Sequence, residues 1–334
     1  MAGQIGISSS QNIDELFKSI ENAWSTYDFT QSTLAQQLSW FKPGTGKSSV
    51  LEFSNMSSAP TELQIGADRQ FGSPEVFKVE IQHKTLVPLQ SVELYQSQLL
   101  MDPYKLIQLQ EDSIQVLAGA RTIWDLELAN VINANPIGWD GVTHFSAVHP
   151  VNPVRPALGV YSNDAGTVDL DEAGLATGLD LLNRAPFLDG LIDPNRVKKV
   201  LIVVPTRALF NKAIRLVGIP MALVPTAGTA AGTSVAASTP YNYNGSLFTF
   251  EVRYNPLLVT SNVATQKQWY LMNVTSATKR GYVTSVVSYP ILNLTGAGPN
   301  DYSRLKNDGI RISWTAVGGV STGLPREVVR ATAP

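Results

Sequence analysis

Residues 102–134 read DPYKLIQLQEDSIQVLAGARTIWDLELANVINA and contain one continuous helical pattern. Apolar side chains recur every three or four residues, which predicts a long helix with a single buried stripe. Asp102 and Pro103 are typical of a helix start, and Asn135-Pro136 of a helix end. At 1.5 Å per residue the helix would be about 50 Å long, so we expect it to act as a spine. We expect its core stripe to comprise Ile107, Ile114, Leu117, Trp124, Leu128 and Val131.

Composition limits the classes of protein that this chain can belong to. Its 334 residues suffice for about two domains, and a 44% hydrophobic content with 16% charged residues allows a substantial core. A net charge of -2 argues against binding nucleic acid by neutralising many phosphates. There is no cysteine, which excludes disulfide scaffolds and thiolate metal sites. No long apolar run or signal peptide is present, so we expect cytoplasmic synthesis without maturation by a large cleavage.

The segments before the spine have the composition of arms. Residues 13–38 carry apolar side chains at helical spacing and predict a short amphipathic helix that needs a neighbour to bury that face. Residues 41–92 combine Gly- and Ser-rich turns with alternating strands, which predicts an extended two-stranded arm. Charges of both signs along this arm fit a solvated face or, more specifically, a surface that pairs with another copy. On the second interpretation the assembly residues are Lys42, Lys47, Arg69, Lys78 and Lys84, together with Trp24.

After the spine, the pattern changes to a compact unit of helices and strands. Residues 136–156 are turn-rich, and a long loop of small and polar residues is expected at 225–246. We expect helices at 170–184, capped by Asp169 or Asp171, and at 206–217. Strands are expected at 197–204, 247–254, 257–260, 268–274, 282–294, 309–317 and 326–331.

Two short motifs resemble catalytic signatures. Residues 43–48, PGTGKS, match the second half of a phosphate-binding loop, but the first glycine, the preceding strand and the following helix are missing. Residues 319–323, GVSTG, match the nucleophile elbow of hydrolases, yet all three histidines precede Ser321 although that fold requires one after it. We therefore expect a turn at each place, the second lying between two C-terminal strands.

Titratable residues suggest two further sites. His144 and His149 near Asp140 could form a metal site or part of an α/β enzyme, but zinc sites need three or four ligands. Asp164, Asp169, Asp171 and Glu172 lack the spacing of a calcium loop, so helix capping explains them more simply. We expect packed or surface histidines, no cofactor, no metal and no catalytic residue.

The order of parts resembles a known family. An N-terminal arm, an extended β-arm, a spine helix, a Gly/Pro-rich crossing and an α/β unit occur in the Hong Kong 97 type α+β fold of tailed-phage major capsid proteins. Within that group the chain most resembles the Mu-like prophage major head subunit family (gpT). The residues that carry this resemblance are Gly138–Gly141, His144–Pro150, Val200–Phe210, Val252–Leu258 and Gln268–Met272.

This resemblance implies a division into parts and a function. The parts would be an N-arm at 1–40, an E-loop at 41–92, a P-domain at 93–160, an A-domain at 161–294 and C-terminal strands at 295–334 that return to the P-domain. The chain would form pentamers and hexamers of an icosahedral virion shell around double-stranded DNA, with scaffold, portal and decoration proteins as further partners and no membrane. A protein nanocompartment shell of the same fold is the alternative, followed by an α/β enzyme.

Overall fold

The computed structural model describes residues 17–18, 20–22, 24–26, 34–55, 75–88, 92–95, 103–217, 248–259, 266–295 and 309–334. Arg69 and the loop expected at 225–246 lie outside these residues, as do the side chains of Ile107 and Leu117. None of the helices within the described ranges is both long and apolar enough to cross a bilayer.

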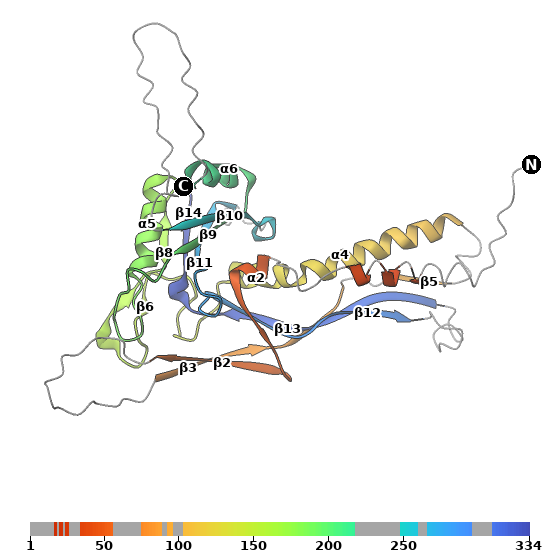
Figure 1. Ribbon diagram of the computed structural model, residues 1–334, viewed down its shortest axis with the longest axis horizontal. Coiled ribbons are helices and arrows are strands. Elements are labelled where there is room, and N and C mark those ends of the chain that lie inside the picture. The colour runs from red at the N-terminus through yellow and green to blue at the C-terminus, as the bar shows by residue number, and fades with distance from the viewer. Residues whose placement is uncertain are drawn as a thin grey trace, which may run out of the picture.

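The molecule consists of a compact part and a long limb (Figure 1). The limb contains the long helix at 103–134 and the long strands at 282–295 and 309–322, and the compact part contains the five-stranded sheet and the helices between residues 164 and 273, with the last strand at 328–332. The helices are α2 (Leu34–Leu38), α4 (Pro103–Ala134), α5 (Glu172–Arg184) and α6 (Arg207–Val217), with short 3-10 turns η1 (Pro156–Leu158), η3 (Pro256–Leu258) and η4 (Pro325–Glu327). The first strands are β1 (Ser39–Pro43), β2 (Ser48–Asn55), β3 (Glu75–Gln82), β4 (Lys84–Leu86), β5 (Val92–Tyr95), β6 (His149–Pro150) and β7 (Val160–Tyr161). The later strands are β8 (Asp164–Thr167), β9 (Lys199–Val204), β10 (Thr249–Tyr254), β11 (Gln268–Asn273), β12 (Tyr282–Thr295), β13 (Gly309–Thr322) and β14 (Val328–Thr332).

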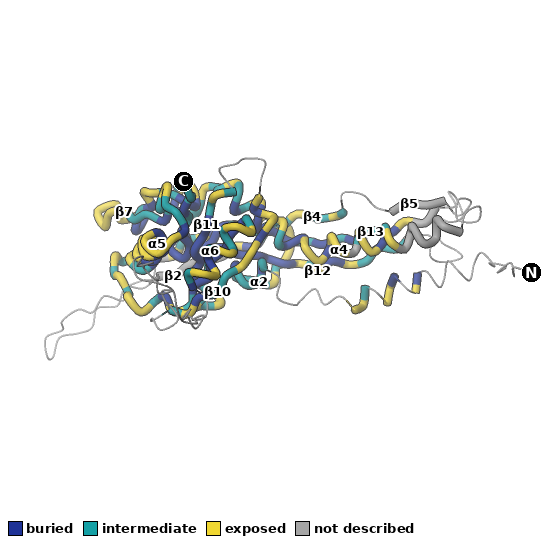
Figure 2. Tube along the Cα trace, turned by 90° about the horizontal axis from the view of Figure 1, so that it is seen from above, coloured by how far each residue is buried: buried dark blue, intermediate teal, exposed yellow. Residues whose placement is uncertain are grey.

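Helix α4 confirms the predicted spine. It packs along β12 and β13, where Trp314 Nε1 donates to the carbonyl of Val116 at 2.8 Å. Trp124 and Leu128 are at most 2% exposed. Val131 is partly buried against the same core. In Figure 2 the buried residues continue from the compact part along the limb between α4 and these strands.

Ile114 corrects the predicted core stripe, because its side chain is 45% exposed. At 3.6 residues per turn, Ile114 lies about 80° round the helix from Trp124 and so at the edge of the stripe. The neighbouring Ser113 faces the sheet instead and is fully buried. The buried stripe therefore passes through Ser113 and leaves Ile114 exposed at its edge.

The long sheet of the limb has the order β1-β12-β13-β4, and β5 pairs with β13 farther out. Strand β1 runs parallel to β12, with Ser39 opposite Tyr282, while β12 and β13 are antiparallel. Residues 282–294 were expected in the A-domain, yet β12 belongs to this limb sheet. The expected boundary at 294 therefore does not separate the two sheets.

The compact sheet has the order β10-β9-β11-β14-β8. One face packs on α5 and α6 through Val200, Ile202 and Val204, and the other face joins the core beneath α4 through Leu201 and Val203. Strand β14 lies between β11 and β8, so this C-terminal strand does not return to the P-domain as expected. Only β13 does so.

Two local expectations also change. Residues 257–260 were expected to be a strand, but η3 turns there, because Asn255 accepts a hydrogen bond from Leu257 N and Pro256 supplies the first helical position. The N-terminal amphipathic segment was expected to need a neighbouring subunit to bury its apolar face. Phe17 and Ile20 of this face are already at most 4% exposed within the single chain.

The arm expected at 41–92 divides into two parts. Strands β2 and β3 form a two-stranded antiparallel hairpin, which agrees with the expected arm. Strands β1 and β4 on either side of it belong to the limb sheet instead. The hairpin is also anchored at its base, where Val79, Ile81 and Val283 form a small buried cluster.

Candidate functional site

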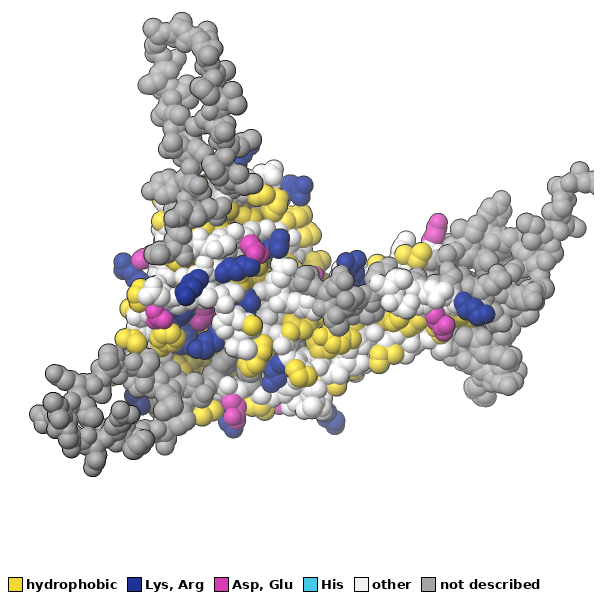
Figure 3. Space-filling view, viewed as in Figure 1, with side chains coloured by type: hydrophobic (Ala, Val, Ile, Leu, Met, Phe, Trp, Pro, Cys, Tyr) yellow, Lys and Arg dark blue, Asp and Glu magenta, His cyan; other side chains and the backbone are white. Residues whose placement is uncertain are grey.

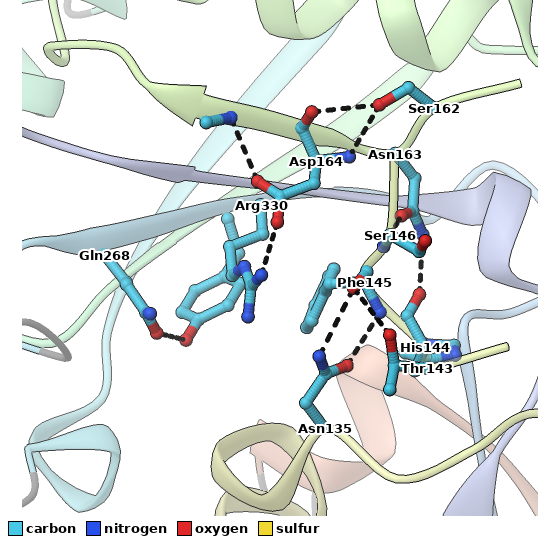
Figure 4. A network of polar contacts seen from close by, with 12 residues as sticks. Asn135, Thr143, His144, Phe145, Ser146, Ser162, Asn163, Asp164, Gln268 and Arg330 are labelled. Atoms are coloured by element: carbon cyan, nitrogen blue, oxygen red, sulfur yellow. Dashed lines mark hydrogen bonds and ion pairs between the residues drawn. The ribbon is translucent and has the colours of Figure 1, made fainter. Parts of the chain in front are cut away.

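A buried polar network begins at the C-terminal end of α4, at the junction of limb and compact part (Figure 4). Asn135 has a left-handed backbone with φ of 44°, which asparagine tolerates better than most residues. Its side chain accepts from Phe145 N at 2.7 Å and donates to Phe145 O at 3.3 Å. One side chain therefore ends the helix and fixes the loop that follows.

Asn163 connects three segments of this network. Its Nδ2 donates to His144 O at 2.7 Å and to Pro325 O at 3.0 Å, and its Oδ1 accepts from Ser146 N at 2.8 Å. The next residue, Asp164, binds Arg330 of β14. Residues 135–148, which connect α4 to β6, are called the crossing loop. Because buried polar groups are costly unless paired, these contacts hold the crossing loop against the compact sheet.

His149 and Asp140 form a buried pair, with Nδ1 to Oδ2 at 2.5 Å. The other ring nitrogen of His149 faces Asn163 Oδ1 at 3.1 Å and His144 O at 3.2 Å. Both ring nitrogens thus face oxygens, so contacts on both edges of the ring fix its orientation. Both side chains are at most 1% exposed, which keeps any substrate away from them. Their geometry suits a structural contact.

His144 acts as a core aromatic residue. Its pKa is lowered from 6.5 to about 3, first by burial and then by the nearby His149. Both ring nitrogens are buried without a hydrogen-bond partner, and its ring lies 4.8 Å from that of Tyr282. Among the described residues, no group of three or more His, Cys, Asp or Glu side chains could hold a metal ion. The ligand set that a zinc site requires is therefore not assembled around His144 and His149.

A second buried cluster fixes the chain between β13 and β14. Glu327 binds Arg196 at 2.6 Å and accepts from Asn273 Nδ2 at 2.6 Å, and Arg326 Nε lies 3.4 Å from the same carboxylate. Burial lowers the pKa of Arg326, an effect that Glu327 opposes. The Arg326 guanidinium also covers the Phe187 ring at 4.8 Å. Sequence reasoning missed this cluster; its signal is Pro-Arg-Glu within an apolar run.

The hydrolase-like GVSTG segment is not a turn, which corrects the expectation. It begins within β13, where Ser321 lies opposite Val283. A Cβ on Gly318 would lie 2.6 Å from the Trp124 ring, and one on Gly319 would lie 2.2 Å from Gln82 O. The glycines thus allow the spine and the hairpin to approach the strand.

The phosphate-loop-like segment leads into a strand rather than a helix. Gly46 has φ of 69° in the turn before β2, and Lys47 is exposed there. A Cβ on Gly44 would lie 2.6 Å from Ser285 Oγ, so this glycine allows close packing on β12. Without a following helix, no set of backbone amides is aimed at a phosphate.

Three of the charged residues expected at subunit contacts, Lys42, Lys78 and Lys84, have partners within the chain. Lys78 pairs with Glu52 across the hairpin at 2.9 Å, and Lys84 pairs with Glu127 of α4 at 3.4 Å. Lys42 donates to Val50 O at 3.2 Å. Figure 3 shows Lys and Arg side chains spread over the compact part among acidic and hydrophobic ones. These partners do not exclude a second role in assembly, which stays a prediction.

Two tryptophans, Trp24 and Trp139, contact the core beneath α4 and the hairpin, respectively. Trp24 is partly buried against the core beneath α4, so its predicted role in assembly is not visible in one chain. Trp139, in the loop after α4, packs against Phe77 of the hairpin with ring centroids 4.8 Å apart and ring planes tilted by 47°. The crossing loop therefore supports both the hairpin and the polar network.

A groove lies where the hairpin leaves the limb. It has a volume of about 380 Å³ and lies between β3, β4, the end of α4 and β13. Glu80, Glu127 and Lys84 are among its polar residues, and Val131, Pro136 and Val320 provide apolar surface. Ser321 also lines it, whereas none of its lining residues is a histidine that could act as a base. The groove suits binding of a side chain or loop better than catalysis.

No family model matches the sequence, and no curated protein is significantly similar to it. Solved structures do match. A chain from the capsid structure of the cyanophage P-SCSP1u is 12% identical, with a TM-score of 0.54, covering 92% of this chain and 90% of that one. A chain from the mature capsid of bacteriophage PhiM1 is 12% identical, with a TM-score of 0.51, covering 92% and 89%. At this identity the likeness shows the fold alone, and that fold is the one found in phage capsid chains.

Proposed function

We propose that this protein is the major capsid protein of a tailed phage, which assembles as pentamers and hexamers into an icosahedral shell around double-stranded DNA. The observation that carries the proposal is the shared fold over 92% of the chain with subunits of phage capsids, the higher TM-score being 0.54. The likeness extends over both the limb and the compact part, as expected for a whole subunit rather than for one common module.

The shape of the molecule supports a role in a lattice. A shell subunit needs a stiff element and contacts that spread to several neighbours. Helix α4, with its 32 residues packed on long strands, supplies the stiffness, and the β2–β3 hairpin projects from the limb beside it (Figure 1). Two buried polar clusters join segments at the junction between limb and compact part, which supports a fixed arrangement of the two.

We further infer membership in the Mu-like prophage major head subunit family. The residues that carry this resemblance, Gly138–Gly141 and His144–Pro150, lie at the junction and include the buried pair of Asp140 and His149. In this assignment the E-loop is the β2–β3 hairpin, the P-domain contains α4 with β12 and β13, and the A-domain contains the compact sheet. Scaffold, portal and decoration proteins are the expected further partners, and the virion is the expected location.

A catalytic function has less support. The histidines that could act as a base are buried in structural contacts, and Ser321 lies within a strand. A net charge of -2 also suits a container whose wall does not hold the packaged DNA tightly.

Light scattering after size exclusion, together with electron microscopy, tests the proposal. We expect particles of megadalton mass with icosahedral outlines, formed by the full chain alone or with a scaffold protein. A stable monomer or dimer at every salt and protein concentration, with phage partners present, would contradict it. Nuclease-protected DNA in particles from infected cells would support a phage head, whereas protein cargo would indicate the nanocompartment alternative.

A further inference from the structure

One loop of the compact part is exposed along its whole length and is apolar apart from one arginine. Residues 153–160 read PVRPALGV, and every one of them is exposed. Val154 is 70% exposed, Val160 64% and Leu158 38%. Arg155 is the loop's single charged residue. We call residues 153–160 the apolar loop. Contiguous apolar surface of this kind on a folded chain is typical of an interaction site.

The apolar loop is held in one conformation by its own backbone. Asn152, which is fully buried, accepts from Val154 N at 2.9 Å and donates to Leu188 O at 3.0 Å. Val151 N donates to Gly159 O at 3.0 Å, and the φ of 85° at Gly159 closes the loop. Because the loop is already ordered, and two prolines restrict it further, docking would cost little conformational entropy.

The groove beside the hairpin has the complementary properties. It is a hollow, and Val131, Pro136 and Val320 provide apolar surface in it. Its charged residues are Glu80, Glu127 and Lys84, which together give an excess of one negative charge. Lys84 already pairs with Glu127, whereas Glu80 is exposed on β3. An incoming positive side chain would therefore meet Glu80 first.

We propose that the apolar loop of one subunit docks into the groove of a second copy of this chain, with Arg155 facing Glu80. The loop is not among the lining residues of its own chain's groove, so the contact would be between copies. Two different patches that meet in this way form a heterologous contact, which continues from subunit to subunit around a ring or lattice. The inference rests on the proposed function, because a shell supplies the neighbouring copies.

Charge reversal tests this contact. Arg155→Glu would place two acidic groups together, and Glu80→Arg would place two basic groups together, so each single variant should reduce particle yield about tenfold, equivalent to about 1.4 kcal/mol. The variant that carries both reversals should recover most of the yield. Lys279→Glu, an exposed change of the same charge outside both surfaces, serves as the matched control and should assemble normally.

A second variant tests the apolar part of the contact independently. Val154→Ser keeps the charge and should also lower the yield, while circular dichroism shows that the subunit stays folded. Yields are counted by electron microscopy and sedimentation. Normal assembly of Arg155→Glu, or failure of the double reversal to restore folded subunits to particles, would overturn the inference. The inference would also be overturned if changes in the apolar loop lowered the particle yield only when another phage protein was present. If the unmodified chain forms no particles under any condition, the proposed function fails instead.

Discussion

The buried cluster around Glu327 offers a sharp test of how the compact part is held together. In Glu327→Gln the side chain keeps its shape but loses the charge that Arg196 and Arg326 share. The Glu327 side chain is 2% exposed and that of Arg196 is 8% exposed, so water cannot replace the missing charge. Breaking a buried ion pair from one side typically costs about 3–5 kcal/mol of the free energy of unfolding.

Glu251→Gln is the matched control. Glu251 also lies between two cations, with Lys199 at 2.6 Å and Arg253 at 3.5 Å, but its side chain is 35% exposed. Partly exposed pairs are screened by solvent, so this change should cost about 1 kcal/mol or less. The two substitutions are chemically identical; the sites differ in burial and in the hydrogen bond that Glu327 accepts from Asn273.

Urea denaturation followed by tryptophan fluorescence measures both costs, since the chain contains six tryptophans. It is repeated at several protein concentrations, because assembly would add to the apparent stability. We expect Glu327→Gln to lose about a fifth or more of a typical stability of about 5–15 kcal/mol. Equal losses in the two variants, or a loss below about 1 kcal/mol at Glu327, would refute the argument from burial.

Two further predictions follow from the core. Folding lowers the pKa of His144 from 6.5 to about 3. The contribution of His144 to stability is therefore complete above pH 6.5 and is lost as the pH falls toward 3, by up to about 1.4 kcal/mol per pH unit. His144→Phe should flatten this acid dependence in pH-dependent urea titrations, and an unchanged slope would contradict the assignment. Gly119→Ala, on an open face of α4, should raise the unfolding free energy by about 1 kcal/mol, whereas Gly319→Ala should lower it by about 1–3 kcal/mol, because its Cβ would lie 2.2 Å from Gln82 O. A stabilising Gly319→Ala in thermal unfolding would be inconsistent with this close approach.

Local features of the fold could be predicted from the sequence. The spine helix is visible in its own periodicity, and Asp171 is the N-cap of α5, accepting from Gly174 N, because a capping residue acts within one turn. Strand β11 is predicted for the same reason, since its apolar run is continuous and bounded by polar residues. Such features depend on neighbours in sequence, which one chain displays directly.

The remaining features depend on contacts between distant residues. The place of β14 in the compact sheet is decided by β11 and β8, and the exposure of Ile114 depends on which face of α4 the distant strands cover. The cluster of Arg196 with Arg326 and Glu327 joins a loop to a turn far along the chain. No spacing rule reports these pairings, because each partner looks like an ordinary surface charge in its own segment.

The parallel pairing of β1 with β12 has a consequence for the order of folding. Ser39 and Thr284 share a hydrogen bond across 245 residues of chain. Closing a loop of that length in an unfolded chain costs on the order of 5 kcal/mol of entropy. Contacts of such separation form late, after local helices and hairpins. A newly made chain should therefore spend time with the edge of β12 uncovered and its hairpin unplaced. This delay would keep immature subunits from joining partners too early, and it also defines the interval in which they are most prone to aggregate.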